Sequence, residues 1–124
     1  MDRLKSKRIL VVEDSPYLQD INKEILKQEG FDVSCVGNGK EALVYLRGVS
    51  DKPDLIVLDI QMPDMDGYEF RRHQLADTRI ADIPVVVVTG RSLDDELADM
   101  RAGKIIAKTT SLTAFIEAVH RCCA

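Results

Sequence analysis

The sequence predicts an α/β fold, in which one doubly wound domain contains a five-stranded parallel sheet with helices on both sides. Five apolar runs of strand length alternate along the chain with segments in which apolar residues recur at helical spacing. The apolar runs are continuous rather than alternating, which indicates strands buried on both faces, as in a parallel sheet. The chain has 124 residues and neither an internal repeat nor a low-complexity tract, so we expect a single domain over residues 1–124.

The composition is that of a globular domain and argues against several classes of function. The chain is 45% hydrophobic and 31% charged with a net charge of −4, which disfavours direct nucleic-acid binding. No apolar run reaches the ~18 residues of a membrane span, and no apolar segment marks a secretory signal at the N-terminus. The three cysteines, Cys35, Cys122 and Cys123, do not form a disulfide pattern. We therefore expect a cytoplasmic protein with reduced thiols and no membrane insertion.

The first half of the chain contains two predicted strands, each followed by a helix. The strand at Arg8–Glu13 leads to a helix that has Ser15 as its N-cap and Pro16 in its first turn, and that ends at Gly30. The second strand covers Phe31–Val36, and the sequence GNG ends it. Apolar residues at helical spacing identify both helices: Leu18, Ile21, Ile25 and Leu26 in the first, and Ala42, Leu43 and Leu46 in the second, which ends near Gly48.

The second half contains three more strand and helix pairs. The strands are predicted at Asp54–Asp59, Ile83–Thr89 and Lys104–Lys108. The helix after the first of these begins at about Asp66 and has the weakest periodicity, because Gln74 stands where an apolar residue is expected. The other two helices have serine caps and apolar stripes: Ser92 with Leu93, Leu97 and Met100, and Ser111 with Leu112, Phe115, Ile116 and Val119.

Polar residues suited to chemistry stand at the ends of four predicted strands. The first strand ends in Glu13 and Asp14, the third in Asp59, the fourth in Thr89 and the fifth in Lys108. The carboxyl ends of parallel strands share one edge of the sheet, where doubly wound folds place their sites. A single aspartate at a strand end is usually a turn former or a helix cap. The convergence of four strand ends favours a functional site instead.

The three carboxylates of this set predict a site for a hard divalent cation. Clustered carboxylates repel one another, and Mg²⁺ (or Mn²⁺) relieves this repulsion through oxygen ligands. We expect Asp14 and Asp59 to bind the ion directly, Glu13 to bind through water, and the backbone carbonyl of Gln61 to complete the set. The hydroxyl and the ammonium group at the other two strand ends suit the oxygens of a phosphoryl group.

With these features the chain resembles the receiver domains of two-component response regulators, the CheY-like family with a flavodoxin-like fold and the strand order 2-1-3-4-5. The resemblance covers residues 7–121. It rests on the acidic pair in VVEDS, the segment DLIVLDIQMPDMDG, the strand PVVVVTG and the lysine after the last strand. The second of these segments is the most specific.

The resemblance implies a phosphoacceptor function. Asp59 would accept a phosphoryl group from a phosphohistidine on a histidine kinase or a histidine phosphotransfer protein. The metal ligands would be those named above, Lys108 would pair with the phosphoryl oxygens, and Thr89 would move to hydrogen-bond the new phosphate and switch a protein-interaction surface. Such a domain is not a classical enzyme, because at most it catalyses its own phosphorylation and dephosphorylation.

In the family, the residues at the positions of Gln61 and Arg91 modulate the lifetime of the acyl phosphate. An interpretation of both as solvated loop residues is equally consistent with the sequence.

The chain departs from the family pattern around its last strand. Thr109 follows Lys108 where the family usually has a proline after a cis bond, so either this bond is trans and the loop is rearranged, or strain is stored there. The loop between Gly103 and Lys108 is about two residues shorter than usual in the family. Ile105 stands where the family has its switch aromatic, which predicts a changed or muted readout.

Two other functions remain as alternatives. A pseudo-receiver would keep the fold as an interaction domain without phosphorylation; the departures at Ile105 and Thr109 favour it, and the complete set of site residues opposes it. An aspartyl-phosphate phosphatase would carry Asp-x-Asp after the third strand, but Gln61 occupies the second position. The cognate kinase, the output and the oligomeric state have no signal in the sequence.

Overall fold

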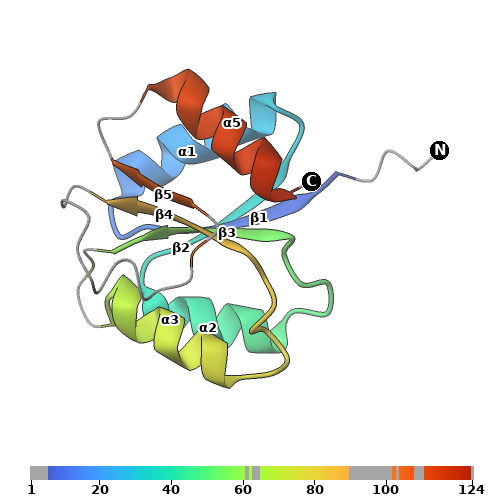
Figure 1. Ribbon diagram of the computed structural model, residues 1–124, viewed down its shortest axis with the longest axis vertical. Helices are drawn as coiled ribbons and strands as arrows, with labels where there is room; N and C mark the ends of the chain where they lie inside the picture. The colour runs from blue at the N-terminus through green and yellow to red at the C-terminus, as the bar shows by residue number, and fades with distance from the viewer. Residues whose placement is uncertain are drawn as a thin grey trace.

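The sheet of the computed structural model has five parallel strands in the order β2-β1-β3-β4-β5 (Figure 1). The structure describes residues 6–60, 62, 65–89, 102, 104–107 and 111–123. The strands are β1 at Arg8–Val12, β2 at Asp32–Val36, β3 at Leu55–Asp59, β4 at Val85–Thr89 and β5 at Lys104–Ala107. The predicted fold class and strand order are both confirmed.

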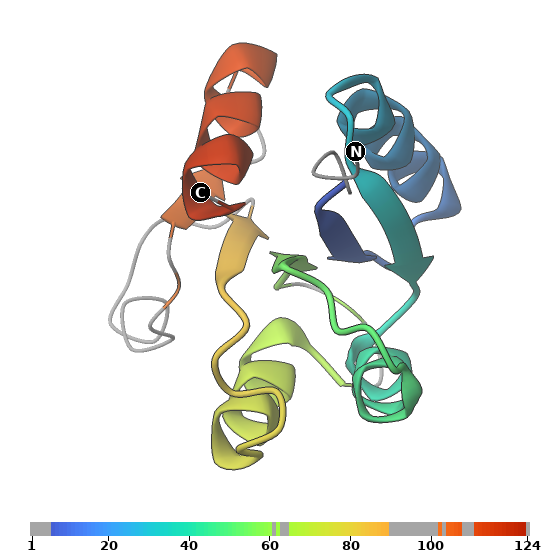
Figure 2. The same cartoon turned by 90° about the vertical axis from the view of Figure 1, so that its right-hand side faces the viewer.

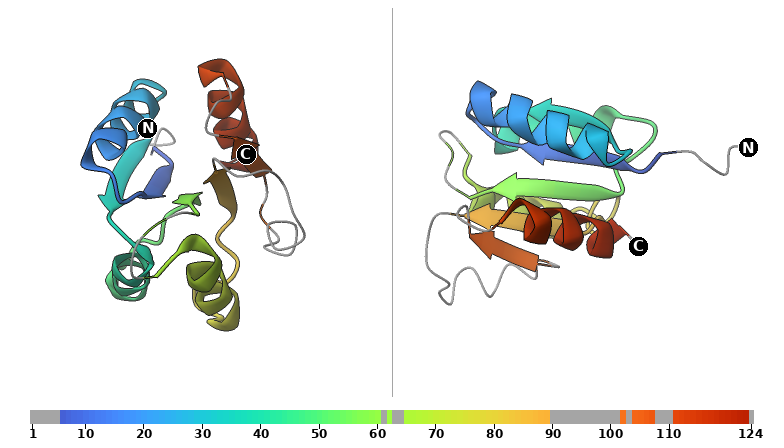
Figure 3. Two further views of the ribbon diagram at one scale, coloured as in Figure 1. Left: turned by 90° about the vertical axis from the view of Figure 1, so that its left-hand side faces the viewer. Right: turned by 90° about the horizontal axis from the view of Figure 1, so that it is seen from above.

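Helices cover both faces of this sheet. The described helices are α1 at Pro16–Gln28, α2 at Gly39–Gly48, α3 at Gly67–Ala76 and α5 at Leu112–Cys123. Figures 2 and 3 show α1 and α5 on one face of the sheet, and α2 and α3 on the other. The helix predicted to begin at Ser92 lies outside the described residues. No helix in the described part of the chain is long and apolar enough to cross a membrane.

Each face of the sheet has its own apolar core, because successive side chains of a strand point to opposite faces. Leu10 of β1 and Leu58 of β3 belong to the cluster that also contains residues of α2 and α3. Ile9 and Val57 belong to the second cluster, with residues of α1 and α5. Each strand supplies side chains to both clusters, so β3 is buried throughout and β1 is buried after Arg8. This burial explains why the two strands are so continuously apolar.

The helices begin where side-chain caps satisfy the first backbone N–H groups. The Ser15 hydroxyl accepts a hydrogen bond from the Leu18 N–H at 3.3 Å, with Pro16 at the first helical position. Asp66 accepts from the Glu69 N–H at 2.9 Å, and Ser111 accepts from the Ala114 N–H at 3.2 Å. These caps confirm the predicted starts of α1, α3 and α5.

The weak periodicity of α3 has a structural explanation at Gln74, which is 0% exposed. Its amide nitrogen donates hydrogen bonds to the carbonyl oxygens of Ile80 at 2.9 Å and Ile83 at 3.0 Å. Its amide oxygen accepts a bond from the Arg71 guanidinium at 2.6 Å. Gln74 is therefore a core residue that ties α3 to the segment leading into β4. The helical periodicity correctly placed this position in the core, which a hydrogen-bonded amide occupies in place of an apolar side chain.

Candidate metal site

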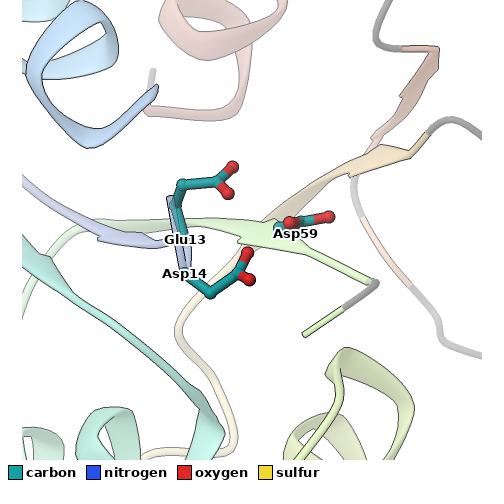
Figure 4. Close-up of side chains that lie close together, drawn as sticks. All are labelled: Glu13, Asp14 and Asp59. Atoms are coloured by element: carbon teal, nitrogen blue, oxygen red, sulfur yellow. The ribbon is translucent and has the colours of Figure 1, made fainter. Parts of the chain in front are cut away.

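Three carboxylates gather at the carboxyl edge of the sheet. Glu13 and Asp14 directly follow β1, and Asp59 is the last residue of β3 (Figure 4). Val12 pairs with Leu58 in the register of β1 and β3, so Glu13, just after β1, and Asp59, the last residue of β3, each come one position later. One carboxylate oxygen from each of the three residues lies within 4.8 Å of the other two. The structure thus brings together the three acidic residues that the sequence placed at strand ends.

The burial and mutual closeness of these carboxylates favour the binding of a cation. Asp59 is 2% exposed and Glu13 is 5% exposed, whereas Asp14 is exposed to solvent. Buried carboxylates lose hydration, and carboxylates this close repel one another. A hard divalent cation counters both effects, since it prefers oxygen ligands and keeps water in its remaining positions. The donor set, which is entirely carboxylate oxygen and open to solvent at Asp14, therefore fits Mg²⁺.

The loop that carries Glu13 and Asp14 is held by hydrogen bonds to its backbone. The Glu13 N–H donates to the Val36 carbonyl at 3.0 Å, and the Glu13 carbonyl accepts from the Gln19 side chain at 2.6 Å. The Glu13 carboxylate also accepts a bond from the Ser15 N–H at 3.2 Å. This loop is thus connected to both β2 and α1, and the bond to Ser15 helps to orient the Glu13 carboxylate.

Two glycines shape the segment that follows Asp59, and sequence reasoning missed them as site-building residues. A Cβ on Gly67 would lie 2.8 Å from the Asp59 carbonyl oxygen, and one on Gly39 would lie 2.8 Å from Cγ of Met65. The N–H groups of the two glycines donate to the carbonyls of Ile60 at 3.0 Å and Met65 at 3.2 Å. The glycines in GNG and MDG were visible in the sequence as turn signals. They also mark places where two backbone segments approach closely, which sequence reasoning did not infer.

Thr89, which the sequence assigns to the same edge, is the last residue of β4 and is 2% exposed. Val88 pairs with Asp59, so Thr89 lies one position beyond the neighbour of Asp59. Ile105 is in β5, pairs with Val87 and packs, half-buried, against the core on the α2 and α3 side. The other predicted site residues, Gln61, Arg91 and Lys108, lie outside the described residues, as do Thr109 and Gly103.

Comparison with known proteins identifies the family. The model of the response regulator receiver domain matches residues 9–120, which is most of the chain. The chain therefore belongs to the response regulator receiver domain family, the CheY-like domains of two-component signalling.

Two characterised relatives differ in how much of their length the chain covers. The polar-differentiation response regulator DivK of Brucella anthropi is 30% identical over 116 residues, which is 91% of this chain and 93% of DivK. The DNA-binding response regulator MtrA of Mycolicibacterium smegmatis is 37% identical over 92 residues, which is 74% of this chain. The chain spans only 38% of the length of that MtrA.

Solved structures show the same fold. The receiver domain of a signal transduction histidine kinase from Syntrophus aciditrophicus is 32% identical and has a TM-score of 0.86, with 95% of this chain and 90% of that chain covered. The receiver domain of a sensor histidine kinase from Pseudomonas aeruginosa, solved with a magnesium ion in its active-site cleft, has a TM-score of 0.85 over 96% of this chain and 98% of that chain. At 23% identity, the second likeness shows the fold alone.

Proposed function

We propose that this domain is a phosphoacceptor switch of a two-component system or phosphorelay, and that Asp59 is the residue phosphorylated. The observation that carries the proposal is the three-carboxylate cluster, with Asp59 buried at the end of the central strand β3. Membership of the receiver family supports the proposal. Burying charged carboxylates also costs free energy, which a role in binding a cation and a phosphoryl group would explain.

The proposed chemistry begins with attack by a carboxylate oxygen of Asp59 on the phosphorus of a phosphohistidine. The new O–P bond forms in line with the N–P bond that breaks, and the imidazole of the donor leaves with the electron pair and takes a proton. Mg²⁺ (or Mn²⁺) would neutralise negative charge on the phosphoryl oxygens. Its ligands would be Glu13, Asp14, Asp59 and the backbone carbonyl of Gln61. The structure supports this set through the three carboxylates that it describes.

Two further side chains are proposed to act on the phosphoryl group. The Lys108 ammonium would pair with its oxygens, and the Thr89 hydroxyl would hydrogen-bond to the phosphorylated Asp59. The position of Thr89 at the end of the strand next to β3 supports its part. We propose Gln61 and Arg91 as modulators of acyl-phosphate hydrolysis, with Ile105 replacing the aromatic residue of the switch.

The partners follow from the same proposal. A histidine kinase or a histidine phosphotransfer protein would supply the phosphoryl group, and the domain would bind an unidentified protein target through a phosphorylation-dependent surface. The Syntrophus relative, which is the receiver domain of a histidine kinase, and DivK, a response regulator of similar length, are two precedents for the context of such a domain.

The second candidate is a pseudo-receiver that binds partners without being phosphorylated. The observation in its favour is Ile105 in β5, at the position of the switch aromatic, together with Thr109 after Lys108. Neither departure removes a carboxylate of the cluster, so phosphoacceptance is the better-supported function.

The test is incubation of the chain with Mg²⁺ and acetyl phosphate, followed by intact-mass measurement. We expect wild type and Asp82→Asn, the same change at an exposed loop aspartate, to gain one phosphoryl group, and Asp59→Asn to gain none. A beryllofluoride salt should shift the backbone resonances around Asp59 in wild type. No response of wild type to either reagent would favour the pseudo-receiver, whereas multiple turnover of a phosphomonoester would favour a phosphatase.

A further inference from the structure

We propose that Gln19 of α1 is a positioning residue for the metal site, which sets the geometry of the Glu13–Asp14 loop before the cation binds. The inference rests on the proposed function, since it concerns the same carboxylate cluster. Gln19 touches none of the reacting groups in this assignment; it acts through the backbone of the acidic loop.

The Gln19 side chain joins the ends of two strands. Its amide nitrogen, Nε2, donates to the carbonyl oxygen of Glu13 at 2.6 Å and to that of Val36 at 3.3 Å. Both partners are carbonyl oxygens, which only accept, so the amide must present its NH₂ group to them and its orientation is unambiguous. The end of β1 is thereby connected to the end of β2 through a side chain of α1.

The backbone of Gln19 fixes the other side of the same loop. Its N–H donates to the carbonyl oxygen of Ser15 at 2.9 Å. Gln19 therefore binds the chain both before and after Asp14, at the carbonyls of Glu13 and Ser15. Asp14 is exposed, so the position of its carboxylate depends largely on the backbone on either side of it.

The consequence for metal binding is preorganisation. A loop that is already in the binding geometry loses less conformational entropy when the ion binds, so affinity rises without a new contact to the metal. Groups that hold metal ligands in place without touching the metal typically affect affinity by about 10–100-fold. If Gln19 only satisfied two carbonyl groups, its loss would lower folding stability and leave the affinity of the folded protein unchanged.

The experiment measures the dissociation constant of Mg²⁺ by calorimetry for wild type and for Gln19→Met, using MgCl₂ as the probe. Methionine keeps the length and the unbranched shape of glutamine, and is a comparable helix former, but has no N–H donor. Gln28→Met is the matched control, because Gln28 is an exposed residue at the other end of the same helix and donates to Glu24 at 3.2 Å. Thermal unfolding of all three proteins in EDTA separates stability from affinity.

We expect Gln19→Met to weaken Mg²⁺ binding roughly tenfold while it remains folded in EDTA, and Gln28→Met to match wild type. We also expect faster hydrogen exchange of the Ser15 and Gln19 amides in metal-free Gln19→Met. If wild type binds Mg²⁺ and Gln19→Met binds it equally well, this inference is wrong and the proposed function stands. If wild type itself binds no Mg²⁺, both are wrong. Should Gln19→Met not fold, Gln19→Asn, whose amide is one methylene too short to reach, provides the same comparison.

Discussion

At Gln74, the side chain that looks misplaced in the sequence is among the most buried in the structure. Its three hydrogen bonds reach Arg71 on the same helix and two carbonyls of the segment that follows. A buried amide costs free energy only if its polar atoms lack partners. Gln74 therefore provides both packing and a connection between α3 and the approach to β4.

A substitution that improves the apolar pattern of α3 should destabilise the protein. Gln74→Leu removes three hydrogen bonds and leaves the partner groups in a buried environment, so we expect the free energy of unfolding to fall by about 2–4 kcal/mol in urea denaturation. Gln28→Leu, the same change at an exposed helical position, should alter it by no more than about 0.5 kcal/mol. Greater stability of Gln74→Leu than of wild type would contradict this account of the network.

The cysteines show how burial decides reactivity at single residues. Burial, followed by the nearby Asp54 carboxylate, raises the pKa of Cys123 to about 11, and burial raises the pKa of Cys35 as well. Both thiols therefore remain protonated at neutral pH, and the protonated form is the unreactive one. Cys123 is the last residue of α5 and part of the core beneath that helix.

Among the elements, α3 begins in close contact with the end of β3. Its first residue, Gly67, is so close to the end of β3 that an added Cβ would lie 2.8 Å from both the Asp59 carbonyl oxygen and Cα of Ile60. The neighbouring atoms belong to the backbone, which cannot move aside as a flexible side chain can. The proximity of α3 to β3 therefore depends on the absence of a side chain at residue 67.

Gly67→Ala should show this dependence. The overlap with the backbone of Asp59 must displace α3 or the end of β3, and we expect a loss of about 1–3 kcal/mol in the free energy of unfolding, together with weaker Mg²⁺ binding. Gly48→Ala is the control: its added Cβ meets no atom within 4 Å, and alanine is the better helix former by up to about 1 kcal/mol. Equal stability of Gly67→Ala and wild type in chemical denaturation would show that α3 can shift at no cost.

For the molecule as a whole, the ion pairs of Asp77 with Arg79 and with Arg47 of α2 lead to a dependence of stability on pH. Asp77, at the end of α3, accepts hydrogen bonds from the side chain and the N–H of Arg79, and from Nε of Arg47 on α2 at 3.0 Å. The Arg79 side chain first, then its backbone N–H and Arg47, hold the pKa of Asp77 well below its usual range, despite an opposing contribution from burial.

The sign of the effect follows from this lowered pKa. The folded state binds a proton on Asp77 less readily than the unfolded state, whose carboxyl has a pKa of about 3.9. The contribution of Asp77 to stability is thus complete above that value and is lost as the pH falls below it. We expect wild type to be more stable than Asp77→Asn at pH 7 and the difference to shrink below about pH 4, as followed by urea unfolding at each pH. High salt should reduce the difference, and Asp82→Asn should not reproduce it. A constant difference across the acid range would contradict the assignment.

Much of the fold was predictable because its signals are local. The caps at Ser15, Asp66 and Ser111 and the continuous apolar strands depend on neighbours a few residues away, and a parallel sheet follows from strands buried on both faces. The positions of Glu13, Asp14 and Asp59 could also be anticipated, because parallel strands end at one edge.

The remaining features depend on contacts between segments far apart in the chain. The bonds from Gln19 to the end of β2 and the approach of Gly39 to Met65 join residues 17 or more positions apart. Neither has a local pattern, because a glutamine or a glycine looks the same in sequence whether it faces solvent or a distant carbonyl group.

The sequence by itself thus determined the α/β class, the order of the elements and the edge at which the acidic residues stand, because periodicity and capping are properties of short segments. The tertiary structure decided how close the three carboxylates are and what holds their loops. Those distances depend on strand register and on helix approach, which are set only when the whole chain packs.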